Sequence, residues 1–160
     1  ICHKFILKNP SHNLFSHNER YIKLDGTISQ LTNGLFAFED ISKSLYIKNT
    51  LSTSAVVLDK KLINDYGSFD ATLKSSQDYD LWLKISPSMK PMHIDLILGE
   101  YNELENSITS RYYLFRFIDQ LKIAYRYRKY TSMMTFIKKI IKILLSKQWV
   151  LGLLSKKHGF

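Results

Sequence analysis

The stretch SSQDYDLWLKIS, residues 75–86, joins a polar start, two closely spaced carboxylates and an apolar run. Its pattern predicts a helix that begins near Gln77 and is stopped by Pro87, because the residue before a proline avoids the helical conformation. Ser75 precedes Asp78 by the spacing of a capping box, and an acid in the first turn also suits the helix dipole. The start of this helix is therefore the first candidate for chemistry.

The two carboxylates of this segment lie on different faces of the expected helix. Asp78 begins a row of apolar residues at the spacing i, i+3, i+4 and i+7, so we expect it to face inward. Asp80 points elsewhere, and Lys84, four residues on, suits a surface ion pair with it. A metal-binding D-x-D needs both carboxylates to converge on one ion, whereas positions i and i+2 of a helix diverge, so we expect no metal here.

Asp78 has two interpretations on these grounds. As an acid of the first helical turn it stabilises the helix and needs no chemical function. As an inward carboxylate at the end of a buried helix, beside a cleft, it can accept a proton from a hydroxyl nucleophile, which is general-base catalysis. The residues alone leave both interpretations open.

The segments before and after this helix predict alternating strands and helices, and hence an α/β fold. The N-terminal part predicts a short strand in ICHKFILKN (1–9), a loop in SHNLFSHNE (11–19), a hairpin turn at Asp25-Gly26 and a short helix in SQLTNGLFAFED (29–40). The middle part predicts a buried strand in LSTSAVVL (51–58), a helix between an Asp59 cap and Gly67, a loop over 68–76 and a strand over 90–102 that Pro91 begins.

The basic excess of the chain lies in its last fifty residues. Residues 1–110 contain 11 Lys and Arg against 13 Asp and Glu, whereas residues 111–160 contain 12 against a single acid, Asp119. We divide the chain accordingly, into a domain over 1–110 and a basic helical tail over 111–160. Amphipathic helices are expected over 111–129 and 132–146, and no window is long and apolar enough to predict a transmembrane helix.

Three interpretations of this tail are open. The helices could pack on the core with their lysines solvated, or lie on an anionic membrane surface through Lys138, Lys139 and Lys142, which cluster opposite an apolar stripe. Nucleic acid is the weakest of the three, because no helix-turn-helix or aromatic RNA-binding sheet is visible. We therefore expect no nucleic-acid partner.

Cysteine and histidine add little. Cys2 is the single cysteine, so no internal disulfide can form, and His3, His12 and His17 match no zinc-ligand spacing. Residue 1 is Ile, and no basic, apolar and small-residue cleavage pattern follows it, so we expect no signal peptide.

The order of four motifs resembles the C-terminal half of the catalytic domain of family-two glycosyltransferases, the inverting GT-A group of bacterial surface-polysaccharide synthesis. The resemblance covers about residues 20–110. Its motifs are the strand and helix of NTLSTSAVVLDKKLI (49–63), the turn YGSFDATL (66–73), the segment SSQDYDLWLKIS (75–86) in place of E-D-x-D-L-W-x-R, and the closing ILGEYNELENSITS (97–110).

This resemblance implies a function for several residues. Asp78 would be the catalytic base, which deprotonates the acceptor hydroxyl as it attacks the anomeric carbon. Trp82 would support the helix and shape the acceptor side, and Thr53 and Ser54 would line that side of the cleft. Two positions depart from the family pattern: Gln77 replaces an acid, and Lys84 replaces an arginine that could make a bidentate contact.

The resemblance also implies what these residues would lack. The family's nucleotide-binding half, with its metal-binding D-x-D, would precede residue 1, so the chain would be a partial GT-A (nucleotide-diphospho-sugar transferase-like) domain followed by amphipathic helices. We expect this fragment to bind no cofactor itself. A divalent metal such as magnesium or manganese and the nucleotide-sugar donor would come with the other half, and the isolated chain would transfer no sugar.

The expected setting is the cytoplasmic face of the membrane, with a glycan or a lipid-linked molecule as acceptor. The alternative is a non-catalytic membrane-surface or interaction module, a truncated remnant whose basic tail binds lipid. An upstream nucleotide-binding half with a strand-borne D-x-D would favour the enzyme, and an unrelated upstream domain would favour the remnant.

Overall fold

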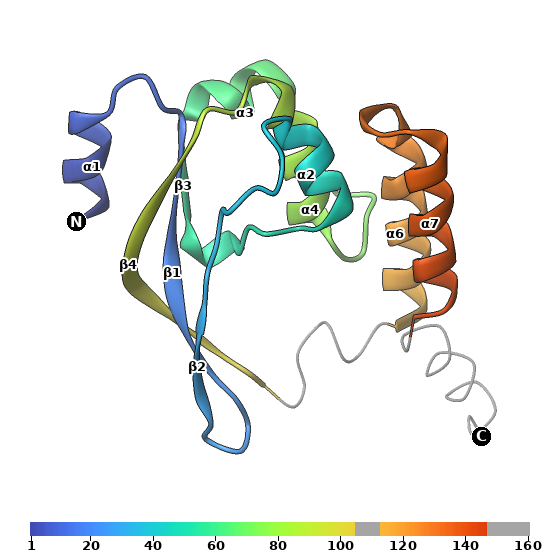
Figure 1. Ribbon diagram of the computed structural model, residues 1–160, viewed down its shortest axis with the longest axis horizontal. Helices are drawn as coiled ribbons and strands as arrows, with labels where there is room; N and C mark the ends of the chain where they lie inside the picture. The colour runs from blue at the N-terminus through green and yellow to red at the C-terminus, as the bar shows by residue number, and fades with distance from the viewer. Residues whose placement is uncertain (105–112, 147–160) are drawn as a thin grey trace.

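The computed structural model describes residues 1–104 and 113–146, and within them the α/β class is confirmed (Figure 1). The strands are β1 (Leu14–Ile22), β2 (Ile28–Leu31), β3 (Val56–Leu58) and β4 (Pro91–Asn102). The α-helices are α1 (Cys2–Lys8), α2 (Ile41–Ile47), α3 (Lys60–Tyr66), α4 (Gln77–Ile85), α6 (Tyr113–Arg126) and α7 (Met133–Leu144). Short 3-10 turns are η1 (Thr53–Ala55), η2 (Ser86–Ser88) and η3 (Arg128–Tyr130).

Strand β1 is the centre of one mixed sheet. It pairs with β4 in parallel along its whole length, and its other edge pairs antiparallel with β3 at its start and β2 at its end. The β1–β4 register shifts on both sides of Asn18, where β4 contributes the extra residues of a bulge. Neighbours on both edges satisfy the backbone of β1, which is what a buried strand requires.

The expected loop over 11–19 is wrong, because most of it forms β1. Ser16, His17, Asn18 and Glu19 are buried in this strand despite their polarity. Their side chains find partners inside the protein: Asn18 Nδ2 donates to Asp95 Oδ1 at 2.9 Å, for example. A buried polar side chain is tolerated when it is hydrogen-bonded, and the partners of Ser16, Asn18 and Glu19 come from distant parts of the sequence.

Three other expected elements differ from the structure. The expected strand at 1–9 is instead the helix α1, none of whose side chains is buried. The expected helix at 29–40 begins as β2 and is then irregular, because Gly34 adopts φ +74 and a Cβ there would lie 1.9 Å from Ser16 Oγ. The strand expected in 51–58 is cut to three residues by η1, and Val57 is 39% exposed.

Local sequence signals predicted the other boundaries well. Asp59 caps α3 by accepting a hydrogen bond from the Lys61 amide, and Gly67 ends that helix with φ +86. The Asp25-Gly26 turn joins β1 to β2, and Pro91 begins β4. Helix α4 ends at Ile85, and Pro87 lies in the η2 turn that follows it.

Helix α4 is the centre of the hydrophobic core. In Figure 1, α2, α3 and α4 lie between the sheet and the α6–α7 pair, so α4 has protein on several sides. Its buried residues share one cluster with side chains of β1 and α2 and with Ile123 and Tyr127 of the tail. The tail therefore completes the same core that the sheet and α2 begin. The α4 residues in this cluster are Tyr79, Leu81, Trp82, Leu83 and Ile85.

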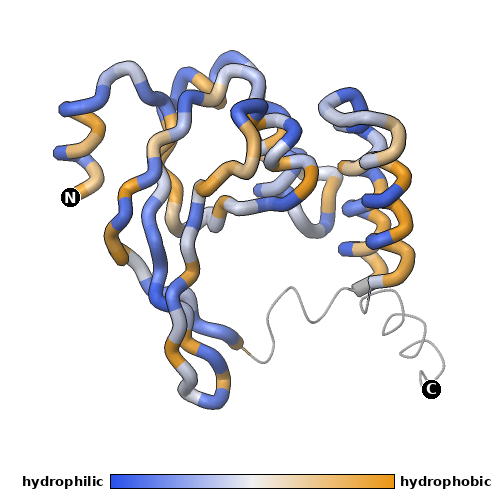
Figure 2. The backbone as a smooth tube through the Cα atoms, viewed as in Figure 1, coloured by the Kyte–Doolittle hydropathy of each residue, from blue (hydrophilic) through white to orange (hydrophobic). Residues whose placement is uncertain are grey.

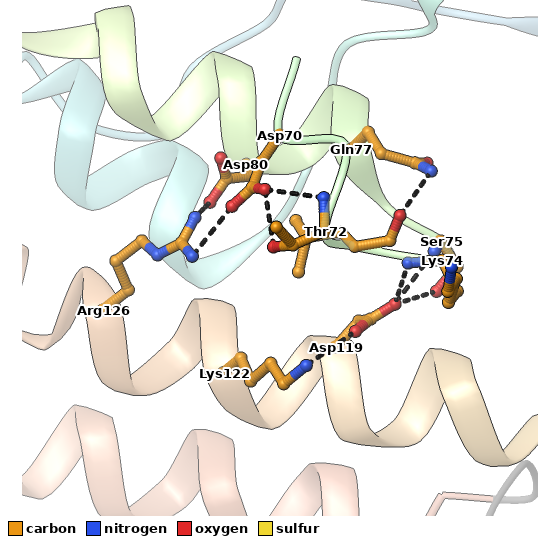
Figure 3. A network of polar contacts seen from close by, with 10 residues as sticks. Asp70, Thr72, Lys74, Ser75, Gln77, Asp80, Asp119, Lys122 and Arg126 are labelled. Atoms are coloured by element: carbon orange, nitrogen blue, oxygen red, sulfur yellow. Dashed lines mark hydrogen bonds and ion pairs between the residues drawn. The ribbon is translucent and has the colours of Figure 1, made fainter.

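Charged contacts hold α6 against α4 and the loop before it (Figure 3). Arg126 Nη1 lies 2.6 Å from Asp80 Oδ1, and its Nη2 lies 2.9 Å from Asp70 Oδ2. Asp119 Oδ2 accepts hydrogen bonds from the Lys74 and Ser75 amides at 2.8 and 2.9 Å. These contacts bind one face of α6 to the loop before α4 and to the first turn of α4.

The α6–α7 pair has a small core of its own and an apolar outer face. Phe117 and Ala124 of α6 pack against Ile143 of α7. Ile137 and Ile141 of α7 are each 49% exposed, and apolar residues recur along this helix in Figure 2. None of the helices in the described parts of the chain has the length and apolar content needed to cross a membrane.

Replacing Arg126 should destabilise the fold more than replacing an exposed arginine. Arg126→Leu leaves the fully buried Asp80 carboxylate without its closest cation, so we expect it to lower the free energy of unfolding by about 3 kcal/mol. Urea denaturation followed by circular dichroism measures this change.

Arg20→Leu is the matched control. Arg20 pairs with Glu100 on the surface, where both side chains are 50% exposed, so its loss should cost below about 1 kcal/mol. Equal costs for the two leucine variants would contradict the assignment of Arg126 as a buried-charge partner.

Candidate functional site

Asp78 lies at the first turn of α4, where two cavities meet. One cavity, of about 760 Å³, lies between α4, the end of α2 and the α6–α7 pair, and we call it the basic cavity. The other, of about 520 Å³, is lined by Thr53 and Phe69 and is called here the Thr53 cavity. Asp78 lines both and is half-buried, so its carboxylate is open to a ligand in either.

The Asp78 carboxylate is fixed by two hydrogen bonds. Thr53 Oγ1 donates to Oδ2 at 3.0 Å, and the Tyr79 amide donates to Oδ1 at 2.8 Å. An ionised carboxylate has about four lone-pair positions, so it can still accept a hydrogen bond from a ligand hydroxyl. The structure thus brings together Asp78 and Thr53, two of the residues singled out from the sequence.

Ser54 and Trp82 do not join them. Ser54 Oγ donates to Glu19 Oε1 at 2.6 Å and lines neither cavity. Trp82 is 1% exposed and packs in the core under α4, so it supports the helix but contacts no ligand space. The expectation that Ser54 lines the acceptor side and that Trp82 shapes it stays a prediction; in the structure the Ser54 hydroxyl bonds to Glu19 of β1, and Trp82 packs in the core.

Asp80 is not the surface residue that the helical spacing predicted. It has no exposed surface, and its closest partner is Arg126 of α6 rather than Lys84, whose Nζ lies 3.9 Å from Oδ2. The reason is that α6 covers the face of α4 that was expected to meet solvent. The two carboxylates still diverge: Asp78 faces the cavities, and Asp80 faces α6.

The start of α4 also differs from a capping box. The Ser75 amide and hydroxyl bond to Asp119, not to Asp78. The cap residue is Ser76, which has φ +57 and whose side chain makes no capping hydrogen bond. A non-glycine residue in this left-handed conformation is strained, and such strain is often found at functional sites.

The three tail lysines line one cavity, and two of them, Lys138 and Lys142, are also exposed to solvent. Lys138, Lys139 and Lys142 line the basic cavity, together with Arg116 and Lys48. The use of these lysines on a membrane surface stays a prediction; α7 packs on α6 through Ile143, and its lysines lie on the side of α4 and the end of α2.

Lys139 is held tightly by the wall of the basic cavity. Its Nζ donates to the Tyr46 carbonyl oxygen and, at 2.9 Å, to the Tyr79 hydroxyl. The ammonium also lies 4.8 Å from the centre of the Tyr46 ring, a cation–π distance. Burial, and then repulsion from Lys142, lower the pKa of Lys139 to about 8.

The residues present do not fit a divalent metal. Asp78 and Asp80 diverge, and the Asp80 carboxylate is occupied by Arg126. Over residues 1–104 and 113–146, no three histidine, cysteine or acidic side chains come together as a metal site would need.

Comparison with known proteins gives no family for this chain. Neither protein-family models nor curated protein sequences match it. The interpretation of the site therefore depends on the order of its motifs and on the geometry around Asp78.

Four residues that shape the site were not singled out from the sequence. Glu19 and Asn33 form a buried hydrogen-bonded pair at 3.1 Å, and Glu19 also holds Ser54, the neighbour of Thr53. Asp119 and Arg126 hold the loop and the first turn of α4. Only Asp119 among these four carried a signal in the sequence. It is the single acid in a strongly basic tail, and a lone acid suggests a specific partner.

The free energy of unfolding should rise with pH between about 8 and 10.5 because of Lys139. The native state releases this proton near pH 8 and the unfolded state near 10.5, so between these values the unfolded state binds more protons. The gain is at most about 1.4 kcal/mol per pH unit. Urea denaturation at several pH values across this window measures it.

Variants at the same position provide the control. Lys139→Met has no proton to lose and Lys139→Arg cannot lose one, so both should lack this part of the slope. A wild-type slope in Lys139→Met would show that another group causes the pH dependence.

Proposed function

We propose that this chain forms the acceptor side of an inverting glycosyltransferase, with Asp78 as the catalytic base. The observation that carries the proposal is a half-buried carboxylate at the meeting point of two cavities, held by Thr53 and still able to accept a proton. The motif order over residues 20–110 supports the same function by resemblance. Thr53 is then a positioning residue, because its hydroxyl holds Asp78 Oδ2 in place.

The reaction is a single displacement. A hydroxyl oxygen of the acceptor attacks the anomeric carbon of a nucleotide-sugar donor, and the bond from that carbon to the diphosphate oxygen breaks. Asp78 accepts the hydroxyl proton, and the nucleoside diphosphate leaves with the bonding electron pair. Attack from the face opposite the leaving group inverts the anomeric centre. In this proposal the donor and any metal are bound by a half that precedes these residues.

The same proposal places the protein at the cytoplasmic face of a membrane, in surface-polysaccharide synthesis. The exposed isoleucines of α7 supply an apolar face, and Lys138 and Lys142, both exposed, lie beside it. An apolar face flanked by cations suits the surface of an anionic bilayer.

Asp78→Asn should abolish most of the transfer activity. Measured in the full-length protein that carries this chain, the turnover rate should fall by ~10²–10⁴, the usual contribution of a general base. Donor binding and the melting temperature should be unchanged, because the amide is isosteric and Asp78 is only half-buried.

Asp65→Asn is the matched control, because Asp65 is an exposed acid of α3 outside both cavities. It should keep the wild-type rate. Unchanged turnover in Asp78→Asn would discard the assignment of the base.

A second candidate function is a non-catalytic membrane-surface module. The observation that favours it is the exposed apolar face of α7, which includes Met133 at 69% exposure besides the two isoleucines. Under this alternative Asp78 has no chemical function, and the basic cavity is a by-product of the way α7 packs.

Membrane contact through α7 can be tested by vesicle sedimentation. With vesicles of phosphatidylcholine and phosphatidylglycerol, Ile137→Asn/Ile141→Asn should weaken binding by about tenfold or more, because two half-exposed apolar side chains no longer insert. Added salt should weaken wild-type binding as well.

Leu24→Asn/Ile28→Asn is the control pair, since these side chains are 58% and 62% exposed on the β1–β2 hairpin. Equal loss in both double variants would show that α7 is not the membrane-binding face.

A further inference from the structure

The basic cavity gathers cations from three separate parts of the chain. Lys48 follows α2, Arg116 belongs to α6, and Lys138, Lys139 and Lys142 belong to α7. Among the described residues that line this cavity, Asp78 is the one carboxylate. A cavity with one sign of charge and low-dielectric walls concentrates ions of the opposite sign.

These lysines are not neutralised by neighbouring acids. Within residues 1–104 and 113–146, neither Lys138 nor Lys142 has a carboxylate within ion-pair distance, and Lys139 bonds only to uncharged oxygens. Bringing like charges together costs free energy, and here burial, followed by repulsion from Lys142, lowers the pKa of Lys139. An anionic ligand in the cavity would remove that cost.

The first turn of α4 adds to the same field. Residues 75–79 line the basic cavity; the Tyr79 amide bonds to Asp78 Oδ1, and the side chain of Ser76 makes no capping hydrogen bond to the first turn. The amino end of a helix carries partial positive charge and binds anions, phosphate groups in particular. Lysine ammonium groups and a helix end together are suited to the oxygens of a phosphate or diphosphate.

We infer that the basic cavity binds the phosphate or diphosphate group of a lipid-linked sugar acceptor. This inference rests on the proposed function, since Asp78 at the edge of the cavity would face the acceptor hydroxyl while the lysines hold the anionic group. The exposed Ile137 and Ile141, on the same helix as the lysines, supply an apolar surface for the lipid chain. A volume of about 760 Å³ accommodates a headgroup of sugar and diphosphate size.

Calorimetric titration with two probes tests the anion site and the lipid preference. The probes are inorganic diphosphate and geranyl diphosphate, which carries the same anion on a short isoprenyl chain. Both should bind the wild-type chain, and geranyl diphosphate should bind more tightly. Lys138→Gln/Lys142→Gln should weaken both by about tenfold or more, because two charge-assisted contacts are lost.

Lys60→Gln/Lys61→Gln is the control with the same loss of charge, placed on the exposed side of α3. It should bind as the wild type does. Absent binding to the wild type, or equal loss in both double variants, would overturn the site. Equal affinity for the two probes would keep the anion site and overturn the lipid assignment.

Asp78→Asn separates this inference from the proposed function. Removing a negative charge from the edge of the cavity should leave diphosphate binding unchanged or tighten it. Diphosphate binding with full transfer activity in Asp78→Asn would overturn only the base. Full loss of activity in that variant, with no diphosphate binding by the wild type, would overturn only the cavity assignment.

Discussion

The burial of the Asp80 carboxylate constrains the whole region around the candidate site. A carboxylate with no exposed surface needs a cationic partner, because an unpaired buried charge is strongly destabilising. Arg126 provides that partner from α6, so α6 must lie along α4. About two turns earlier on α6, Asp119 binds the amides that precede α4. The loop, the first turn of α4 and the tail therefore form one unit, and Asp78 lies within it.

This constraint also separates the chemistry available to the two acids of the α4 start. Asp80 is held by a guanidinium and has no access to solvent, so no substrate hydroxyl can reach it. Asp78 has the opposite environment, with one hydroxyl and one amide as partners and two cavities in front of it. The rigid pairing of Asp80 thus supports the position of Asp78. A general base needs such a fixed setting, because proton transfer depends on hydrogen-bond geometry.

What the sequence predicted well depends on residues that are near neighbours in the chain. The cap at Asp59, the stop at Gly67 and the start of β4 at Pro91 each follow from the backbone preferences of one or two residues. The misassigned elements depend on distant partners instead. Residues 14–19 have the polar composition of a loop, and they can be buried because Asn33, Ser54 and Asp95 bond to their side chains. Arg126, the partner of Asp80, lies 46 positions further along the chain.

Helix α7 shows the same limit in another form. Its amphipathic pattern was clear, but a periodic pattern gives two faces and does not say which one meets the protein. In most surface helices the apolar face packs inward. Here Phe136, Ile140 and Ile143 do so, Ile137 and Ile141 remain half-exposed, and the lysines line the cavity that Asp78 also lines. Exposing large apolar side chains is unfavourable in water, and so is gathering cations around a cavity. Under the proposed function, one amphiphilic acceptor relieves both costs, because its anion meets the lysines and its chain meets the isoleucines of the same helix.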